Sequence, residues 1–277
     1  MPLTSFQKEV LTILRDNRSE RSHFAGGLVL NAPDDSSRFS HDFDIFRESA
    51  EDVVRCSQRD VESLRQAGFE IDLLARTNEW DPGKLVTFRK ARVRKAGQHV
   101  EIDWAADSAF RFFPIVPDEQ LGWRLHLFDM AVNKAHALAA RTETRDYIDI
   151  VELCREYPLA AICWAAPGKD PGYSPLYLLK MMRRFAKIDP AKMEEIQARQ
   201  LDPIALKMEW MEMSDKAEAD MIRQADEFPR TPIGVAFVDK DGHPGWIGDN
   251  PTLRPHPPCI RGCWPVVHLD AAEPPPA

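Results

Sequence analysis

The 277-residue chain lacks any apolar run that approaches the length of a membrane span, and no signal peptide opens it. Its five cysteines form no disulfide-framework pattern, so reduced thiols are the simplest account, and we expect a cytoplasmic protein without membrane contact. Positive charge is not in excess. The formal net charge of −8 argues against a uniformly basic protein that coats nucleic acid, while a local basic patch stays open. The composition, 44% hydrophobic and 29% charged, is typical of an ordinary globular protein with one large or two smaller domains.

One short stretch combines two features that phosphate chemistry needs. Gly26 and Gly27 have no Cβ, so a triphosphate can approach their backbone N–H groups closely. Asp42 and Asp44 alternate with apolar residues, and because side chains alternate along an extended strand, the two carboxylates project together, with Ser40 on the same side. Two parallel carboxylates form a hard oxygen site suited to Mg²⁺, which commonly bridges carboxylates and substrate phosphates.

The segments around this stretch show helical and extended patterns. Apolar spacing predicts helices at 3–17 and 50–67, and a short strand at 21–25 that delivers the glycines to the start of a helical turn. The polar segment 32–38 indicates a loop that leads into the Asp-x-Asp strand. Cys56 fills the second helix rather than acting as a nucleophile, because no His or Asp partner lies at a telling spacing.

A Gly-Gly pair followed by Ser-x-Asp-x-Asp between apolar residues resembles the nucleotidyltransferase superfamily that includes DNA polymerase β. A second pattern lies further along, with Asp-Met-Ala-Val-Asn-Lys-Ala at 129–135 and Arg-Asp-Tyr-Ile-Asp-Ile at 145–150. It resembles the Lys motif and the Arg-Asp-x-x-Asp motif of the AbiEii-type (abortive infection) nucleotidyltransferase toxin family. The likeness covers about residues 20–155, and this second part is the more specific one.

The resemblance implies an α+β fold: a small mixed or antiparallel sheet with flanking helices (a polymerase β-like core), followed by a mainly helical C-terminal part. From the patterns and the proline content beyond the likeness we expect a helical domain at 157–230 and a hairpin with a Pro-rich tail at 231–277. The resemblance places the nucleotidyltransferase core at 1–156. It also implies a Mg²⁺-dependent enzyme that moves a nucleoside monophosphate from an NTP to an acceptor hydroxyl. The implied acceptor is RNA, such as the end of a tRNA, and the implied partner is the antitoxin of a toxin–antitoxin system.

The same resemblance assigns the acidic and phosphate-binding positions. It makes Asp42 and Asp44 ligands of two Mg²⁺ ions, with the Gly-Gly backbone and Ser40 on the β- and γ-phosphates. Asp103 is the expected third carboxylate, which helps to ligate the second ion or accepts the hydroxyl proton. One departure concerns Leu28, which stands where many relatives carry Ser or Thr after the glycines, so Ser40 is the remaining source of a hydroxyl.

The third carboxylate lies in a predicted hairpin whose two alternating strands and turn are at 85–94, 99–105 and 95–98. In the register of a tight turn, Arg92 faces Glu101 and Lys90 faces Asp103. One interpretation of this face is a charge-paired, solvated sheet surface. The other makes Asp103 part of the metal site on a strand beside the Asp-x-Asp pair, and Glu101 competes with it for that role.

Two further helices carry the more specific motif. The first runs from about Asp129, a plausible cap, to Arg141, and the second begins near Arg145. By the resemblance Lys134 and Asp146 are functional: Lys134 offsets triphosphate charge, and Asp146 orients Lys134 or a substrate hydroxyl. For Arg145 and Asp149 we favour a plain i,i+4 ion pair on the helix surface.

Beyond the resemblance the sequence says less. Residues 158–227 look largely helical, and 232–248 predict a hairpin, while the last 49 residues hold 11 of the 22 prolines and indicate an irregular arm. A basic face that is usually a solvated helix surface, and that RNA phosphates could also use, comprises Lys180, Arg183, Arg184 and Lys187. A zinc site is a minor possibility, since its Cys-x₃-Cys spacing departs from the common knuckle, at His256, Cys259, Cys263 and His268.

Three other functions stay open at this point. The chain could be a catalytically silent module that keeps the fold and binds a nucleotide or a protein. It could transfer nucleotides to a small molecule such as an aminoglycoside, which its net acidity favours. The Asp-x-Asp pair could also belong to a metal-dependent glycosyltransferase, although the upstream glycines and the Lys and Arg-Asp helices argue against that.

Overall fold

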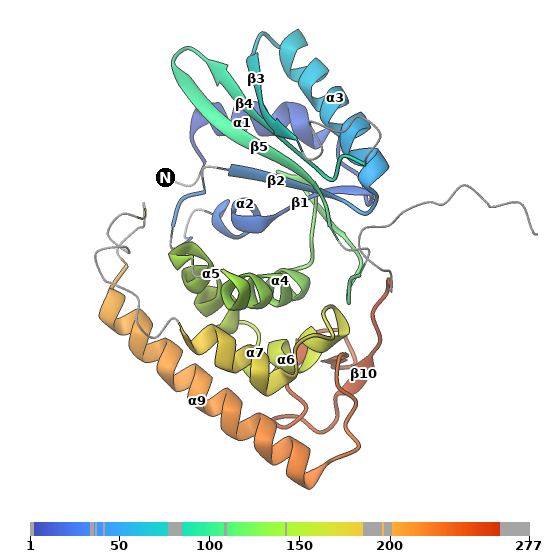
Figure 1. Ribbon diagram of the computed structural model, residues 1–277, viewed down its shortest axis with the longest axis vertical. Helices are drawn as coiled ribbons and strands as arrows, with labels where there is room; N and C mark the ends of the chain where they lie inside the picture. Colours follow the sequence, from blue (N-terminus) through green and yellow to red (C-terminus); the bar gives the residue numbers. More distant parts are fainter. Residues whose placement is uncertain are drawn as a thin grey trace, which may run out of the picture.

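The computed structural model of the protein describes residues 3–33, 36, 38–40, 42–76, 85–107, 110–141, 143–184, 196 and 201–260. The helices are α1 (Ser5–Arg15), α2 (Gly26–Asn31), α3 (Ala50–Gln66), α4 (Leu127–Ala140), α5 (Thr144–Cys154), α6 (Leu159–Ala165), η1 (Ala166–Gly168), α7 (Pro175–Met182) and α9 (Pro203–Glu227). The strands are β1 (Ser22–Ala25), β2 (Asp42–Arg47), β3 (Glu70–Arg76), β4 (Phe88–Lys95), β5 (Gln98–Ala106), β6 (Val116–Asp118), β7 (Gly122–Arg124), β8 (Ala236–Val238), β9 (Pro244–Gly245) and β10 (Arg254–His256). The predicted α+β fold is confirmed (Figure 1).

The main sheet is mixed, with the strand order β3-β4-β5-β2-β1-β7-β6. Its centre matters most for the site, because β2 and β5 run parallel there and pair Asp44 with Asp103. β1 lies antiparallel on the other side of β2 and pairs Ala25 with Asp44, so the chain leaves β1 beside this aspartate. The sheet thus brings together the two acidic strands and the glycine turn that the sequence separates.

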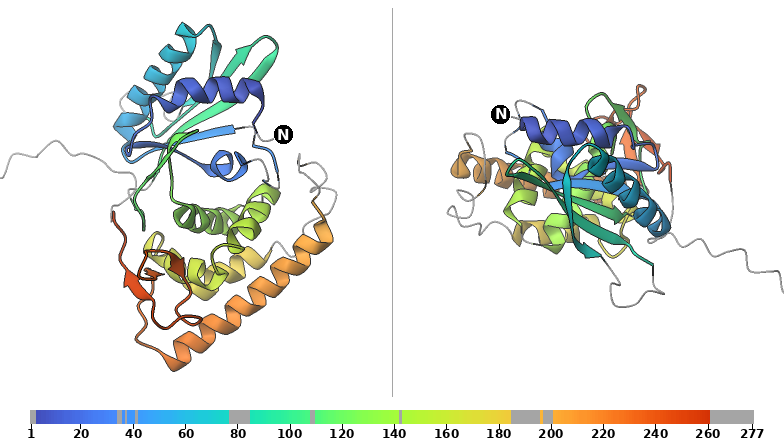
Figure 2. Two further views of the ribbon diagram at one scale, coloured as in Figure 1. Left: turned by 180° about the vertical axis from the view of Figure 1, so that it is seen from behind. Right: turned by 90° about the horizontal axis from the view of Figure 1, so that it is seen from above.

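The two faces of the sheet have different neighbours. Phe43, Ile45, Ile102 and Trp104 are buried and belong to one hydrophobic core with the apolar residues of α1 and α3. α2 lies on the opposite face, between the sheet and the pair α4 and α5 (Figures 1 and 2). Because side chains alternate along a strand, the aspartates of β2 and β5 project toward α2 and α4.

The hairpin of β4 and β5 has the predicted register. Lys90 lies opposite Asp103 and Arg92 lies opposite Glu101. A two-residue turn of Ala96 and Gly97 connects the strands, and both residues have positive φ, 51° and 78°. Such values match the right-handed twist of the flanking strands.

The second hydrophobic core lies below the sheet in Figure 1 and contains α4 to α7, α9 and the small sheet β10-β8-β9. Leu127 and Leu30 pack against both cores, so the sheet and the helices are in direct contact. The division at 156 and 230 into separate domains stays a prediction. Within the described residues, no helix is both long and apolar enough to span a membrane.

The region after α9 is more regular than its proline content indicates. β8 pairs with β9, as the predicted hairpin requires, and β10 adds a third strand. His256 stacks on Phe113 with ring centroids 4.7 Å apart, which attaches this small sheet to the helical core. Of the four residues considered for zinc, Cys263 and His268 lie outside the described residues, as does Lys187 of the basic face.

The expected cap of the helix before the Arg-Asp motif is wrong. α4 begins at Leu127, and its N-cap is His126, whose ring nitrogen accepts from the backbone N–H of Phe128. Asp129 is buried instead and accepts from the backbone N–H groups of Phe112 and Phe113, at 2.8 and 3.0 Å. The loop before β6 offers donors that no local spacing rule could reveal.

A buried charge joins the helices to the sheet. Asp60 on α3 pairs with the Arg18 guanidinium, and both side chains are fully buried. The indole N–H of Trp104 donates to Asp60 at 2.7 Å, and the Asn17 amide donates at 2.9 Å. Cys56 lies one turn away, and burial raises the pKa of its thiol, in agreement with the predicted packing role.

We expect Asp60→Ala to lower the free energy of unfolding by about 3–5 kcal/mol, because Arg18 would remain buried without a counter-charge. Urea unfolding measures the change. The matched control is Asp16→Ala, whose carboxylate is 77% exposed, and its effect should stay within about 0.5 kcal/mol. Equal effects of the two substitutions would show that the Asp60 network does not stabilise the fold.

Candidate active site

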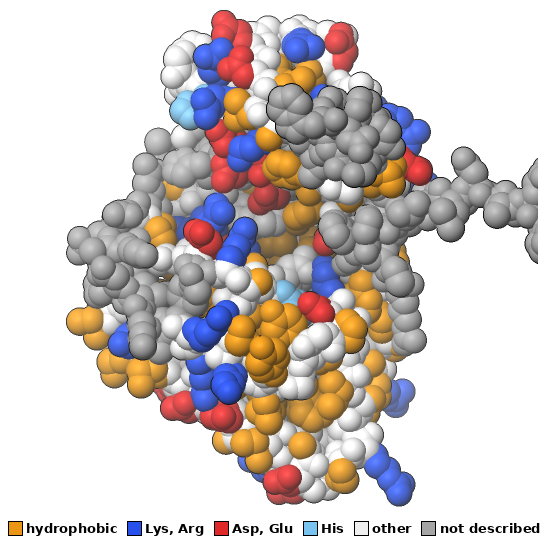
Figure 3. All heavy atoms as spheres, in the orientation of Figure 1, with side chains coloured by type: hydrophobic (Ala, Val, Ile, Leu, Met, Phe, Trp, Pro, Cys, Tyr) orange, Lys and Arg blue, Asp and Glu red, His pale blue; other side chains and the backbone are white. Residues whose placement is uncertain are grey.

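A polar cavity of about 420 Å³ lies between the acidic strands of the sheet and the helices α4 and α5. The molecular face in Figure 3 is hollowed in this region, with acidic side chains inside the hollow. The cavity collects most of the residues predicted from the sequence, which line it as follows: Gly27, Ser40, Asp42, Asp44, Asp103 and Lys134. Gly26 lines an adjoining cavity together with Asp44 and Lys134.

The pairing of β2 with β5 determines which acids meet. Asp44 and Asp103 are directly opposite on parallel strands, and Asp42 lies two residues earlier on the same face. Glu101 does not line the cavity, because its carboxylate is held by Arg92 at 2.6 Å and by Lys90 at 2.9 Å. Of the two acids considered for the third position, Asp103 is therefore the one that faces the other aspartates.

Two of the three acids are paired with cations. Lys90 lies 3.2 Å from Asp103, and Arg145 lies 3.6 Å from Asp42. The oxygens of the three aspartates do not all come within 4.8 Å of one another, a spacing reached among the described residues by Asp239, Asp241 and His243 on an exposed turn. The cleft carboxylates offer the hard oxygen donors that Mg²⁺ prefers, so the chemistry of the donor set fits this ion.

Asp44 has the most perturbed carboxylate in the cleft. Burial, and then the negative charges of Asp103 and Asp42, raise its pKa to about 6, although Lys134 acts in the opposite direction. Burial also raises the pKa of Asp103. Crowded, buried carboxylates of this kind repel one another, so a bound divalent cation would relieve an unfavourable charge distribution.

Gly26 makes this arrangement sterically possible. Its φ is +67°, and a Cβ at this position would lie 1.8 Å from Oδ2 of Asp44. A Cβ on Gly27 would lie 2.7 Å from Nη2 of Arg38 and 3.1 Å from Oγ of Ser40. The glycine backbone therefore forms one wall of the cleft. Leu28, the next residue, has no hydroxyl and is fully buried, so its side chain offers the cleft no hydrogen-bond donor.

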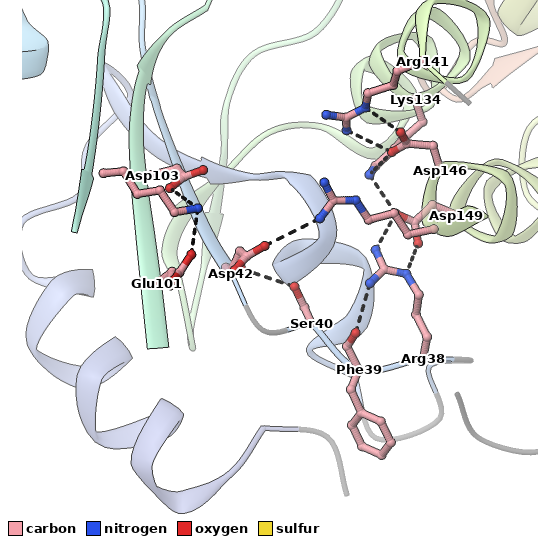
Figure 4. A network of polar contacts seen from close by, with 12 residues as sticks. Arg38, Phe39, Ser40, Asp42, Glu101, Asp103, Lys134, Arg141, Asp146 and Asp149 are labelled. Atoms are coloured by element: carbon pink, nitrogen blue, oxygen red, sulfur yellow. Dashed lines mark hydrogen bonds and ion pairs between the residues drawn. The ribbon is translucent and has the colours of Figure 1, made fainter. Parts of the chain in front are cut away.

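Lys134 on α4 is held by two aspartates of α5. Its ammonium nitrogen lies 3.0 Å from Asp146 and 2.7 Å from Asp149. Arg38 binds Asp149 with two hydrogen bonds of 2.7 Å, and Arg141 binds Asp146 at 2.7 Å. Figure 4 shows this network facing the acids of β2 and β5 across the cleft.

The two aspartates remain charged in this setting. Burial acts to raise the pKa of Asp146, but Arg141 and Lys134 outweigh it and the pKa is lowered. Burial likewise opposes ionisation of Asp149, and Lys134 and Arg38 lower its pKa below the usual value. Charge-assisted hydrogen bonds therefore fix Lys134. Its contact with Asp146 corresponds to one of the two roles that the resemblance implies for this aspartate, the orientation of Lys134.

The predicted surface pair of Arg145 and Asp149 is wrong. Asp149 is only 2% exposed at its side chain and is bound by Arg38 and Lys134. Arg145 points to Asp42 instead. The helical spacing of four residues is compatible with a pair, but the tertiary contacts across the cleft offer both groups closer and more buried partners.

Sequence reasoning missed three cations of the cleft: Arg38, Arg141 and Arg145. Arg38 lies in a segment that only looked like a polar loop, and its partner Asp149 is 111 positions away in the chain. The signal that could have identified it is its position two residues before Ser40 of the Ser-x-Asp-x-Asp motif.

Comparisons with known proteins give one family profile and several similar solved structures. The profile of the family described as "Nucleotidyl transferase AbiEii toxin, Type IV TA system" matches residues 12–220. A search of curated proteins gives no match. Among solved structures, the chain is similar to JHP933 from Helicobacter pylori, with 16% identity, a TM-score of 0.47, and coverage of 81% of this chain and 94% of that one. It is also similar to the nucleotidyltransferase toxin MenT4 from Mycobacterium tuberculosis H37Rv, with 14% identity, a TM-score of 0.43, and coverage of 75% and 91%.

We expect Asp44→Asn to stabilise the metal-free protein at neutral pH. Above its pKa of about 6, Asp44 carries a buried negative charge that lowers the free energy of unfolding, and Asn carries no charge. By linkage the gain is up to about 3 kcal/mol. It should be complete above pH 7, shrink as the pH falls through 6, and vanish below about 4, where the folded and unfolded states both carry the proton. Thermal unfolding in EDTA across this range measures it. A gain that is independent of pH would contradict the assigned cause.

Proposed function

This chain belongs to the AbiEii family of nucleotidyltransferase toxins, and from this premise we propose that its cleft moves a nucleoside monophosphate from an NTP to RNA with the help of Mg²⁺. The observation that carries the proposal is the meeting of Asp42, Asp44 and Asp103 in one cavity with the Gly27 backbone and Lys134. This set combines donors for divalent metal with groups for phosphate, which phosphoryl transfer requires.

The roles of the acids follow from their positions. Asp42 and Asp44 lie on one face of β2 and would hold Mg²⁺, with Asp103 beside them on β5. When bound, Mg²⁺ supplies positive charge to the attacking and leaving oxygens. Asp103 lies on the neighbouring strand and burial raises its pKa, so it would either complete the metal site or accept the proton of the acceptor hydroxyl.

The phosphate side uses the other wall. The backbone N–H groups of Gly26 and Gly27 and the hydroxyl of Ser40 would bind the β- and γ-phosphates, and Lys134 would offset their charge. The acceptor oxygen forms a bond to the α-phosphorus while the bond from that phosphorus to the bridging oxygen breaks. Pyrophosphate leaves, and the hydroxyl proton passes to a base.

RNA as the acceptor, with the end of a tRNA as one case, rests on the family and on the cations around the cleft. Arg141 and Arg145 line the cavity and are about half exposed. The predicted basic face on α7 contributes less, because Arg183 is bound by Asp215 and Glu218. The type IV toxin–antitoxin assignment of the family supports an antitoxin as the partner.

The decisive experiment incubates the protein with each labelled NTP, Mg²⁺ and total RNA. We expect one or more labels to transfer to RNA, and Asp42→Ala to reduce the rate by more than the roughly 10–100-fold that loss of an outer-shell metal partner costs. Asp16→Ala is the control, since Asp16 is exposed and lies outside the cleft.

The same assay separates the alternatives. Nucleotide binding without pyrophosphate release would favour the silent module. Transfer to aminoglycosides in preference to RNA would favour a small-molecule nucleotidyltransferase, and binding of sugar nucleotides with sugar transfer would favour a glycosyltransferase. Equal activity of Asp42→Ala and the parent protein would refute the proposed metal site.

A further inference from the structure

A second cavity opens beside the polar cleft and shares Asp44, Lys134 and Arg141 with it. Its volume is about 610 Å³, and we call it the side chamber. Ligand pockets for small organic molecules have volumes of roughly 300–1,000 Å³, so the chamber is large enough for a nucleoside. A group held there would lie next to the aspartates and the glycine backbone.

The walls of the side chamber are apolar over most of their extent. Phe46 and Ala106 come from the ends of β2 and β5, while Met130 and Ala137 come from α4. Flat, weakly polar rings pack well against such walls, whereas a phosphate would lose its hydration there. The polar cleft is therefore suited to charged groups such as phosphates, and the side chamber is suited to a flat ring.

One end of the side chamber carries a polar cluster. The Lys169 ammonium donates to Oδ1 of Asn133, and it lies 3.4 Å from Oδ2 of Asp107. The three residues come from different elements: Lys169 follows η1, Asn133 lies on α4 beside Lys134, and Asp107 follows β5. Lys169 and Asp107 are only 14% and 24% exposed at their side chains, so this cluster is built into the chamber rather than attached to its surface.

Backbone packing fixes Lys169 in place. A Cβ on the preceding Gly168 would lie 2.2 Å from the carbonyl oxygen of Gly234, so the two backbones are in direct contact. The Lys169 N–H also donates to the carbonyl of Ala166 at 3.0 Å. A lysine held at its backbone and at its ammonium group presents its N–H donors in defined directions.

Two members of the cluster, Lys169 and Asn133, can offer donors to a ligand, while the Asp107 carboxylate accepts from Lys169. A lysine ammonium only donates, so its contact with Asn133 requires the Asn carbonyl oxygen to face Lys169 and the Asn NH₂ group to face away from it. Among the described residues, Asn133 and Asp107 are the hydrogen-bond partners of the ammonium group, so within this part of the chain a third N–H can face a ligand. The polar end is therefore suited to a ring that presents acceptor atoms.

We propose that the side chamber binds the base of a nucleoside that reacts in the cleft, and that Lys169 and Asn133 select bases with a carbonyl acceptor over adenine. The inference rests on the proposed function, whose site it extends. Guanine, cytosine and uracil each present a carbonyl oxygen, while adenine has an exocyclic amino donor in place of the carbonyl. An amino group against Lys169 would set donor against donor.

The nucleoside has two possible sources, the NTP and the last nucleotide of the RNA acceptor, so the experiment has two arms. The first measures equilibrium binding of ATP, GTP, CTP and UTP with Mg²⁺ and no acceptor. The second measures label transfer to short RNAs that differ only in their final nucleotide. In at least one of the two arms, we expect the affinity or the transfer rate of the parent protein to be about tenfold or more lower for adenine than for the other bases. This is the size of discrimination that one base-reading hydrogen-bond pair gives.

Three substitutions test the residues. Lys169→Met should reduce the discrimination to less than about threefold, and Lys169→Arg, which keeps the donors, should retain most of it. Asn133→Asp replaces donors with acceptors at constant size and should shift the preference toward adenine. The matched control is Lys240→Met, on a turn where the Lys side chain is 89% exposed, and it should leave both arms unchanged.

The outcomes are separable. A changed NTP preference assigns the chamber to the NTP, and a changed preference for the final RNA nucleotide assigns it to the acceptor; either supports the inference. Unchanged preferences in both arms for Asn133→Asp and for Lys169→Met, with unfolding temperatures like that of Lys240→Met, overturn it. A parent protein that discriminates bases in binding but transfers no label would overturn the proposed function and leave this inference intact.

Discussion

The contact between the Gly26 backbone and the Asp44 carboxylate is the constraint on which the cleft depends. Any side chain at position 26 would occupy the space of Asp44, since a Cβ would lie 1.8 Å from Oδ2. This contact lets α2 begin directly above the paired strands β2 and β5, so that backbone N–H groups and carboxylates share one cavity. It also buries Asp44 and raises its pKa, which makes the site unfavourable for the isolated protein and receptive to a cation.

The opposite wall of the cleft contains a buried cation that needs counter-charges. Lys134 is buried, and a buried cation is costly unless it is paired. Asp146 and Asp149 pair with it, and Arg38 and Arg141 then balance the excess of negative charge. Because Arg38 precedes β2 and Asp149 lies on α5, this network ties the sheet to the helices at the site itself. The acids of β2 and β5 and Lys134 of α4 lie on strands and a helix, which position side chains more precisely than loops do.

Local patterns predicted the parts of the site that lie along single strands. Alternation placed Asp42 and Asp44 on one face, and the hairpin register correctly paired Lys90 with Asp103. The prediction that Arg145 pairs with Asp149 is wrong because helical spacing identifies only neighbours on one helix, whereas both residues find their partners on other elements. The contact of Arg38 with Asp149 bridges 111 positions and depends on how the sheet packs on α5, which no periodicity encodes.

The cleft and the side chamber are not built from the N-terminal part alone. The acids, the glycines and Lys134 precede residue 156, but Lys169 follows it and closes the side chamber. α5, which carries Asp146 and Asp149, packs in the same hydrophobic core as α9, and the Tyr147 hydroxyl reaches the carbonyl of Leu206. The helical part therefore stabilises the wall that holds Lys134 and supplies a polar group of its own. The family profile, which extends to residue 220, spans both contributions.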